Sequence, residues 1–409
     1  MLRKKLADVG VSGLLPEPLP RKGVGFSHKR PGMIGTRRGG APVGRRALSE
    51  AGIAVALSPG WPTFPRHRGP LGSMPAPDRP TSWGRKVAGR NDALGGCMKV
   101  VITGGAGFIG SNLARVLVAA PEIDEVVVVD DLSTGSLANL AGVAATVHVG
   151  TFLDVELMDK ACDGASAIVH LGALPSVPRS VEDPLASHHA NATGTLMVLE
   201  AARRAGNAHV VAASSSSVYG GNPVLPKRED LRTMPLSPYA VSKLATESYL
   251  LAYGHCYDLP VLPFRFFNVF GPLQPADHAY AAVIPRFIDA ALAGRPLTVH
   301  GDGEQTRDFT NVATVCGVLA DAVLRRVTND GPVNLALGTR TSLNALIALL
   351  ADVLGHPVDV THVAPRAGDV RDSQADSAEL RRLFPDAPAV ELRDGLAETV
   401  AWFRSRQAS

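Results

Sequence analysis

One short segment limits the possible folds of this chain more than any other. Residues 99–120 read as an apolar run, then the glycine-rich turn TGGAGFIG (103–110), then apolar residues at helical spacing. Gly104 permits a tight turn, Gly107 lets the backbone approach a phosphate at the positive end of the helix, and Gly110 lets helix and strand pack closely. The segment predicts the phosphate-binding strand, turn and helix that open a nucleotide-binding sheet.

A carboxylate stands where such a sheet would use one. The apolar run 125–129 ends at Asp130, 20 residues after Gly110. A carboxylate at the end of this second strand can accept hydrogen bonds from the ribose hydroxyls of an adenosine, and it would repel a 2′-phosphate. A glycine-rich turn next to an unrelated surface acid is the alternative, but the two features at this spacing favour NAD over NADP.

Further apolar runs indicate how the sheet continues. Ala167–Leu171 and Val210–Ser214 are strand-like, and stretches with apolar residues at three-to-four spacing separate them from each other and from the runs before them. This alternation predicts an α/β protein with a Rossmann-type, doubly wound parallel sheet.

The first 97 residues differ from the rest in composition. They hold 17 Lys and Arg against 5 Asp and Glu, and they are rich in Pro and Gly without sustained apolar periodicity. Such a segment cannot offset its ordering entropy with a core, so we expect 1–97 to be disordered. Its charges lack the aromatic interleaving of a nucleic-acid site, and its longest apolar stretch is too short to cross a membrane. One hypothesis is that Met98 is the true start of the protein.

The four cysteines lie far apart in the sequence, at positions 97, 162, 256 and 316. Their spacing favours reduced thiols over a disulfide framework or a zinc site, so we expect a cytoplasmic protein without a bound metal.

A second constellation has the pattern of a catalytic site. In the segment 237–243, Ser237 can cap a helix, Pro238 can occupy its first turn, and Tyr239 and Lys243 then share one helical face. A nearby ammonium stabilises a phenolate, so Lys243 is expected to lower the pKa of Tyr239 and make it a general base. A Tyr and a Lys four apart are usually an ordinary helix pair, but the cofactor motif makes the catalytic reading the better one.

Residues 98–409 resemble an extended short-chain dehydrogenase/reductase of the NAD-dependent epimerase/dehydratase family, and among these the UDP-sugar 4-epimerases. The serine-rich segment 214–220 matches the family motif whose catalytic serine falls on Ser215. The resemblance implies that Ser215, Tyr239 and Lys243 are catalytic. It implies that NAD is bound by Gly104, Gly107, Phe108, Ile109, Gly110, Asp130, Asp131, Thr134, Gly135, Tyr239 and Lys243.

The resemblance also implies a division of the chain into an NAD-binding domain, 98–270, and a smaller α/β domain. The smaller domain, 271–409, would mainly bind a UDP-sugar, with some segments returning to the first domain. The residues implied to hold the substrate are Ser176, Arg179, Asn268, Arg307, Arg366, Asp369 and Ser373. Arginines suit phosphate oxygens, and a carboxylate can hold a ribose. The family further suggests a homodimer joined through helices that include the one carrying Tyr239.

The positions after Ser215 bear on the type of reaction. Family dehydratases carry an Asp-Glu pair there and decarboxylases a Glu two positions on, whereas this chain has Ser216 and Ser217. Neither serine replaces a carboxyl group as acid or base, which favours 4-epimerisation through a 4-keto sugar. Two alternatives stay open: another UDP-sugar conversion, such as epimerisation of UDP-glucuronate, and a non-catalytic sensor of NAD or nucleotide sugars.

Two features favour N-acetylated UDP-hexosamines over UDP-glucose and UDP-galactose, which remain possible as additional substrates. The segment 173–180 is similar to that of epimerases with the hexosamine preference, and Ser373 stands where glucose-specific bacterial enzymes have a tyrosine. Two departures from the family pattern also stand out. Thr151 stands where many relatives have an aspartate near the adenine. Residues 311–314 stand where relatives usually have an aromatic residue and one or two acids, which puts the local helix capping and domain packing in question.

Overall fold

The computed structural model describes residues 98–276, 281–365 and 371–407. The segment 1–97, with its predicted disorder and Cys97, lies outside the described residues. Arg366 and Asp369, which were expected to hold the substrate, lie outside them as well.

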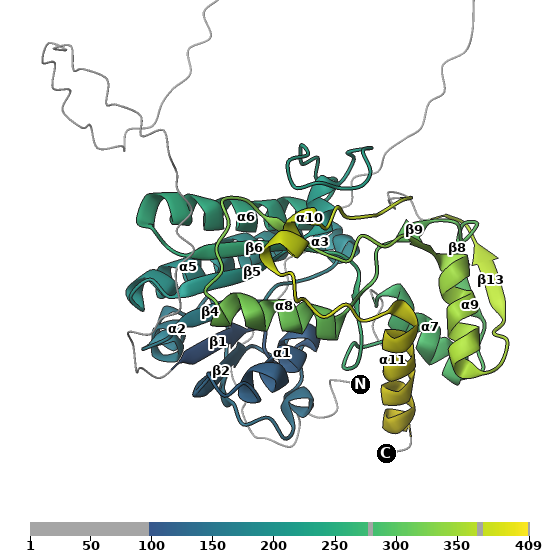
Figure 1. The fold of residues 1–409 in the computed structure, drawn as a ribbon, viewed down its shortest axis with the longest axis horizontal. Coiled ribbons are helices and arrows are strands. Elements are labelled where there is room, and N and C mark those ends of the chain that lie inside the picture. The colour runs from purple at the N-terminus through teal and green to yellow at the C-terminus, as the bar shows by residue number, and fades with distance from the viewer. Residues whose placement is uncertain (1–97, 277–280, 366–370, 408–409) are drawn as a thin grey trace, which may run out of the picture. The chain divides into compact units, whose positions relative to one another are not determined.

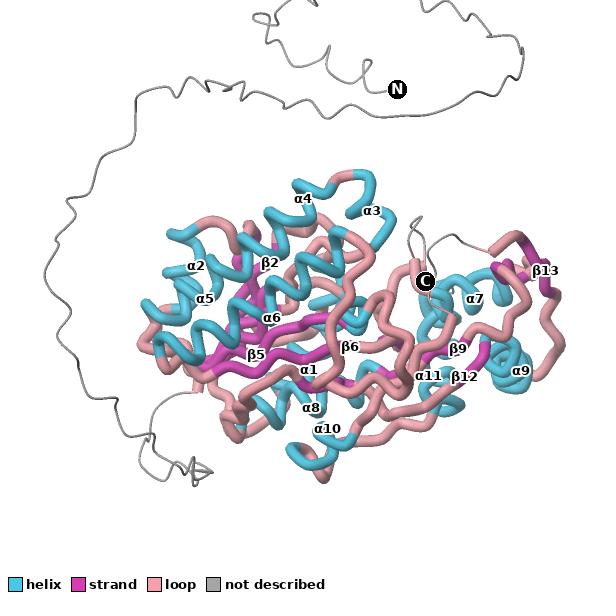
Figure 2. The backbone as a smooth tube through the Cα atoms, turned by 90° about the horizontal axis from the view of Figure 1, so that it is seen from above, coloured by secondary structure: helices cyan, strands magenta, loops and turns pink. Residues whose placement is uncertain are grey.

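A seven-stranded parallel sheet forms the centre of the described chain, in the order β11-β6-β5-β4-β1-β2-β3 (Figures 1 and 2). Its strands are β1 (Lys99–Thr103), β2 (Glu125–Asp130), β3 (Thr146–Val149), β4 (Ala167–His170), β5 (His209–Ser215), β6 (Val261–Phe266) and β11 (Val333–Leu335). The strands predicted from apolar runs are confirmed to within one residue at each end. The order reverses between β1 and β4, which confirms the doubly wound α/β fold.

Helices cover both faces of this sheet because its strands are apolar on both faces. On one face lie α1 (Phe108–Val118), α8 (Val312–Leu324) and α10 (Ala378–Leu383), and on the other lie α2 (Val155–Cys162), α5 (Gly194–Arg204) and α6 (Pro238–Tyr257) (Figure 2). Adjacent residues of β1 serve the two layers: Ile102 packs in the cluster of α1, and Val101 in that of α2 and α5. The α1 helix begins three residues before the predicted 111, directly after Gly107.

Most of the segment after β6 builds a smaller α/β part, at the right of Figure 1. Its elements are α7 (Val283–Leu292), β8 (Leu297–His300), α9 (Leu343–Leu354), β13 (Val360–Val363) and α11 (Leu392–Gln407), and short pairs join β7 (Val269–Phe270) to β10 (Thr310–Asn311) and β9 (Thr306–Arg307) to β12 (Thr341–Ser342). A separate apolar cluster holds α7, α9 and α11 together. Between these elements, α8 and β11 rejoin the central sheet.

Short helices connect the larger elements near the carboxyl ends of the strands. They are η2 (Leu137–Leu140), α3 (Val177–Glu182), α4 (Pro184–His188), the π-helical turn η3 (His189–Thr193) and the 3-10 turn η4 (Ser216–Tyr219). Since all strands of the central sheet are parallel, the ends of β1, β2, β4, β5 and β6 meet at one edge, where open α/β sheets bind their ligands.

A buried histidine at this edge makes the stability of the protein depend on pH. His170 ends β4; its Nδ1 lies 2.7 Å from Thr103 Oγ1, and its Nε2 lies 3.3 Å from Thr195 Oγ1. Burial, together with the charge of Lys243, lowers the pKa of His170 to about 3. The unfolded chain takes up a proton below about pH 6.5 and the folded chain does not, so stability is lost as the pH falls from 6.5 toward 3.

We expect His170→Gln to reduce this acid sensitivity. Between pH 7.5 and 5.5 the wild-type free energy of unfolding should fall by about 1.4 kcal/mol more than that of the variant, since glutamine does not titrate. Urea unfolding at the two pH values measures the difference. His209, whose pKa burial also lowers, to about 4, is present in both proteins and cancels. Equal losses in the two proteins would show that His170 does not carry the effect.

Candidate active site

The glycine-rich turn after β1 brings three backbone segments together. Gly104 has φ +71°, and a Cβ built on it would lie 2.7 Å from the backbone of Gly172, which follows β4. A Cβ on Gly110 would lie 2.2 Å from the carbonyl oxygen of Gly104. Gly107 caps α1 in an extended conformation, and Phe108 and Ile109 form its first turn. Bare backbone thus surrounds the positive end of α1, as a diphosphate requires.

Asp130 lies beside this turn at the end of β2. Its side-chain oxygens accept hydrogen bonds from the backbone N–H groups of Ala106, at 2.9 Å, and Leu132, at 2.8 Å. Burial raises the pKa of this carboxyl, and the N–H donors oppose the rise. Gly135 packs against the same group, since a Cβ on it would lie 2.8 Å from the Ala106 backbone and 3.0 Å from Asp130 Oδ1.

The residues around Asp130 fit the adenosine half of NAD. The glycine-rich turn after β1 leaves backbone without side chains at the start of α1, where a pyrophosphate can bind. A carboxylate at the end of the second strand can bind ribose hydroxyls. Asp131 and Thr134 are exposed in the loop after β2, where Asp131 accepts a hydrogen bond from Ser133 N at 2.9 Å. The structure therefore brings the residues expected to bind NAD to one end of the sheet.

Helix α6 begins where the sequence predicts. Ser237 Oγ accepts a hydrogen bond from Ala240 N at 3.1 Å, and Pro238 occupies the first turn. Lys243 is buried one turn after Tyr239, and its Nζ donates to the carbonyl oxygen of Ala213 in β5 at 2.9 Å. Burial lowers the pKa of Lys243 to about 8.

Ser215, at the end of β5, connects this strand to the helix. Its Oγ accepts a hydrogen bond from Ser217 N at 3.2 Å, so its own proton is left to be donated. Burial raises the pKa of Tyr239, and the interaction with Ser215 lowers it. The expectation that Lys243 brings the pKa of Tyr239 down is not met, because burial outweighs the other contributions and the ammonium group is bound to Ala213.

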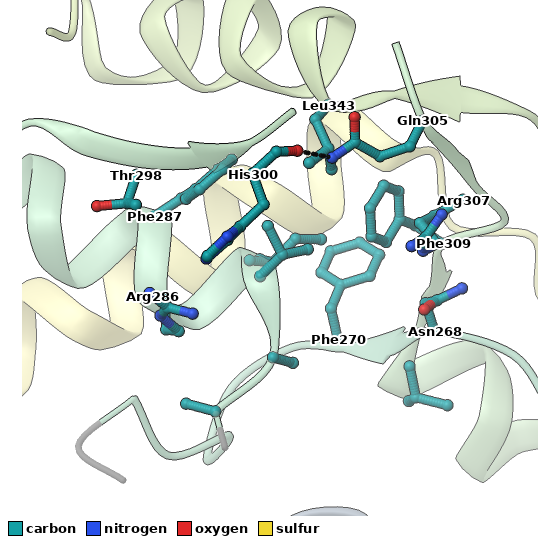
Figure 3. Close-up of a pocket in the computed structure, with 15 residues that line it drawn as sticks. Asn268, Phe270, Arg286, Phe287, Thr298, His300, Gln305, Arg307, Phe309 and Leu343 are labelled. Carbon is teal, nitrogen blue, oxygen red and sulfur yellow. Dashed lines mark hydrogen bonds between the residues drawn. The ribbon is translucent and has the colours of Figure 1, made fainter. Parts of the chain in front are cut away.

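A cavity of about 260 Å³ lies between the end of β6 and the smaller part of the chain (Figure 3). Asn268 and Arg307, which the sequence predicts to hold the substrate, both line it. Asn268 Nδ2 donates to the carbonyl oxygen of Asp308 at 3.3 Å, and Arg307 Nη1 donates to that of Thr306 at 2.8 Å. The structure thus joins two motifs that lie 39 residues apart in the sequence.

Sequence reasoning missed most of the other residues of this cavity. Among them are Phe270, Arg286, Phe287, Thr298, His300, Gln305 and Phe309 (Figure 3). Phe270 and Phe309 meet edge to face with ring centroids 6.4 Å apart, and Gln305 Nε2 donates to the carbonyl oxygen of His300 at 2.6 Å. Phe270 and Phe309 each stand two residues after a predicted residue, Asn268 or Arg307, and that spacing was the available signal.

The remaining predicted residues are distributed around the site. Ser373 lies beside β9, the strand that holds Arg307, and its N–H donates to the carbonyl oxygen of Thr306 at 3.2 Å. Ser176 has φ +101° and caps α3, where its Oγ accepts a hydrogen bond from Arg179 N at 3.3 Å. The α3 helix packs against α6.

A model of the NAD dependent epimerase/dehydratase family matches residues 100–338 of this chain. The chain belongs to this family. It is 38% identical over 322 residues to a UDP-glucose 4-epimerase of Mycolicibacterium smegmatis, and the match covers 76% of this chain and 99% of that protein. The protein is therefore an enzyme that uses NAD as its cofactor.

Solved structures of family members show the same fold. A UDP-N-acetylglucosamine 4-epimerase from Methanobrevibacter ruminantium, in complex with UDP-N-acetylmuramic acid, is 35% identical with a TM-score of 0.72, covering 76% of this chain and 99% of that one. A dTDP-glucose 4,6-dehydratase from Streptomyces venezuelae with NAD bound is 33% identical with a TM-score of 0.70, covering 76% and 98%. Family members thus carry out more than one reaction on nucleotide sugars.

The two departures from the family pattern are accommodated locally. Asn311 caps α8, because its Oδ1 accepts a hydrogen bond from Ala313 N at 2.7 Å, so the capping that the substitution put in question is present. Thr151 Oγ1 accepts a hydrogen bond from Leu153 N at 3.2 Å. Within the described residues, no helix is both long and apolar enough to span a bilayer.

Proposed function

We propose that this enzyme interconverts the two 4-epimers of a UDP-sugar. The observation that supports this most is the set of groups beside Tyr239. The interaction with Ser215 lowers the pKa of Tyr239, and Ser216 and Ser217 follow Ser215 without a carboxyl group. The Ser217 hydroxyl is buried and has no hydrogen-bond partner among the described residues. Elimination of water or carbon dioxide would lack its acid or base here, whereas epimerisation needs neither.

In this proposal Tyr239 exchanges a proton with the 4-hydroxyl of the sugar. Ser215 is held by Ser217 N as an acceptor, so its hydroxyl proton can stabilise the Tyr239 phenolate or the sugar oxygen. Lys243 lies one helical turn away with its ammonium group on the carbonyl oxygen of Ala213, so Ser215 is the described group that favours the phenolate. Bound NAD supplies the acceptor and then the donor of the hydride at carbon 4, so a 4-keto sugar lies between the epimers.

The nucleotide end of the substrate would occupy the cavity that Asn268 and Arg307 line. An arginine suits the diphosphate oxygens, and the aromatic wall of Phe270 and Phe309 suits an apolar or stacked group. Inversion requires this anchor to stay in place while the 4-keto sugar turns its other face toward the hydride donor. A rigid site for the diphosphate serves that requirement.

We infer a preference for N-acetylated UDP-hexosamines, with UDP-glucose and UDP-galactose as additional substrates. Ser373 lies beside the strand of Arg307, and in this proposal an acetamido group needs a side chain smaller than tyrosine at that position. The similarity to the Methanobrevibacter ruminantium UDP-N-acetylglucosamine 4-epimerase supports the same preference.

Purified protein with NAD should convert UDP-N-acetylglucosamine to its 4-epimer with a higher kcat/KM than UDP-glucose. We expect Ser373→Tyr to lower kcat/KM for the acetylated sugar about tenfold or more and to change that for UDP-glucose little, because the larger ring fills the acetamido volume. Product analysis of both sugars measures this, and UDP-glucose serves as the internal control. Turnover of UDP-glucose alone would remove the hexosamine preference.

Two other outcomes would change the proposed function. Turnover of UDP-glucuronate but of neither hexose would reassign the substrate and keep the chemistry at Tyr239. Retained NAD without turnover of any UDP-sugar would favour the sensor, a function for which a Tyr239 pKa that Ser215 lowers has no evident use.

We further infer a homodimer joined through α6. On this helix Val241 is 52% exposed, and on α3 and α4, which pack against α6, Val181 is 65% and Leu185 80% exposed. Large apolar side chains exposed together mark an interface more often than a free surface. Sedimentation of the purified protein tests this, and a monomer at micromolar concentration would contradict it.

A further inference from the structure

A buried ion pair lies beside the end of β5, the strand that carries Ser215. Glu247 stands one turn after Lys243 on α6, and Arg265 stands in β6; their side chains are 3% and 4% exposed. The pair is bidentate, with Arg265 Nε 2.9 Å from Glu247 Oε1 and Nη2 2.9 Å from Oε2. The free energy lost when two charges leave water can exceed the free energy gained from their attraction. A contribution to stability is therefore a weak explanation for the presence of this buried pair.

The ion pair contacts the residue that precedes Ser215. Ser214 Oγ donates to Glu247 Oε1 at 2.5 Å and lies 3.4 Å from the carbonyl oxygen of Lys243. Two successive residues of β5 are therefore hydrogen-bonded to α6, Ala213 through Lys243 and Ser214 through Glu247. Ser215 follows them at the end of the strand and lowers the pKa of Tyr239. The hydrogen bond between Ser214 and Glu247 therefore fixes the position of the end of β5 along the axis of α6.

Arg265 also holds the segment that follows Ser215. Its guanidinium lies over the ring of Tyr219, 4.7 Å from the centroid, and Tyr219 closes the η4 turn. The Tyr219 hydroxyl donates to Asn334 Oδ1 of β11 at 2.7 Å. The backbone is thus fixed on both sides of Ser215, by Glu247 before it and by Arg265 after it.

We propose that Glu247 and Arg265 are positioning residues that set the placement of Ser215 against Tyr239 through Ser214 and Tyr219. Neither touches the reacting atoms; they act through the strand end that they hold. The inference rests on the proposed function, because Ser215 and Tyr239 are the groups that would exchange the proton. Small displacements of such groups have large effects on rate.

The least disruptive test is Ser214→Ala, because Glu247 keeps both bonds to Arg265. We expect kcat to fall about tenfold with KM changed less than about twofold, since the loss lies in alignment and not in substrate binding. Glu247→Leu combined with Arg265→Met removes both charges together, a change that buried pairs tolerate, and we expect about a hundredfold loss in kcat. Ser248→Ala is the matched control: this exposed hydroxyl on α6 bonds only to the carbonyl oxygen of Leu244, among the contacts described.

A second readout does not require turnover. The pKa of Tyr239 is measured by following tyrosinate absorbance as the pH is raised. The titration curve of the same variant carrying Tyr239→Phe is subtracted, so that only the signal of Tyr239 remains. Ser214→Ala should raise this pKa, because a displaced Ser215 stabilises the phenolate less. Wild-type kcat and an unchanged Tyr239 pKa in both variants would overturn the proposal. The proposal would also be overturned if activity fell in proportion to thermal stability while the pKa of Tyr239 stayed unchanged, because that result would indicate a purely structural role for these residues.

The two proposals fail in different ways. If the wild-type protein converts none of the UDP-sugars offered, the proposed function is wrong. The titration of Tyr239 still decides whether Ser214, Glu247 and Arg265 position Ser215, because it is carried out without substrate.

Discussion

Tyr239→Phe loses almost all turnover of the UDP-sugar while it keeps its fold and its NAD. The substitution removes only the hydroxyl whose pKa Ser215 lowers and leaves the half-buried ring in place at the start of α6. A positioned general base contributes about a hundredfold to ten-thousandfold to a rate, so we expect kcat to fall about a thousandfold. Steady-state kinetics measures the loss, and the NAD content and thermal stability of the purified variant show that the site is otherwise intact.

Tyr257→Phe is the matched control for this prediction. It makes the same change on the same helix, but Tyr257 is 43% exposed at the far end of α6, where its ring stacks against Arg203. We expect it to have wild-type kcat. Substantial activity in Tyr239→Phe would remove Tyr239 from the mechanism and would leave Ser215 as the candidate for the proton exchange.

We expect Gly110→Ala to abolish NAD binding and to destabilise the protein strongly. The added methyl group would lie 2.2 Å from the carbonyl oxygen of Gly104 and 2.6 Å from the Cα of Gly105, and backbone atoms cannot move aside as a flexible side chain can. The overlap forces α1 away from the turn, which costs about 3 kcal/mol and displaces the helix end from the phosphate position. Urea unfolding and NAD titration measure the two effects.

Gly331→Ala controls for the chemistry of the substitution. This glycine has no neighbouring atom within 4 Å of the added Cβ, and it is not among the glycines with positive φ. We expect its stability and NAD affinity to equal those of the wild type or to exceed them slightly. Gly110→Ala with wild-type NAD affinity would show that close packing of α1 on the turn is not required for the cofactor.

The features that the sequence determined are those with local causes. Apolar runs placed β1, β2, β4 and β5 to within one residue, because a strand buried on both faces has little polar content at any position. Ser237 and Pro238 marked the start of α6, since capping and the fixed φ of proline act within one turn. The glycine spacing after β1 gave the turn because only glycine can approach backbone so closely.

Tertiary structure alone decided the features that depend on residues far apart in the chain. The cavity near Arg307 combines β7, α7, β8 and β9, and the Glu247–Arg265 pair joins a helix to a strand, so no local pattern contains either. The direction of the Tyr239 pKa was predicted wrongly for the same reason. The sequence showed an ammonium four residues away but not the burial that raises the pKa, nor Ala213, which takes the hydrogen bond of Lys243. Burial is a property of the whole packed structure, and it outweighed the nearby charge.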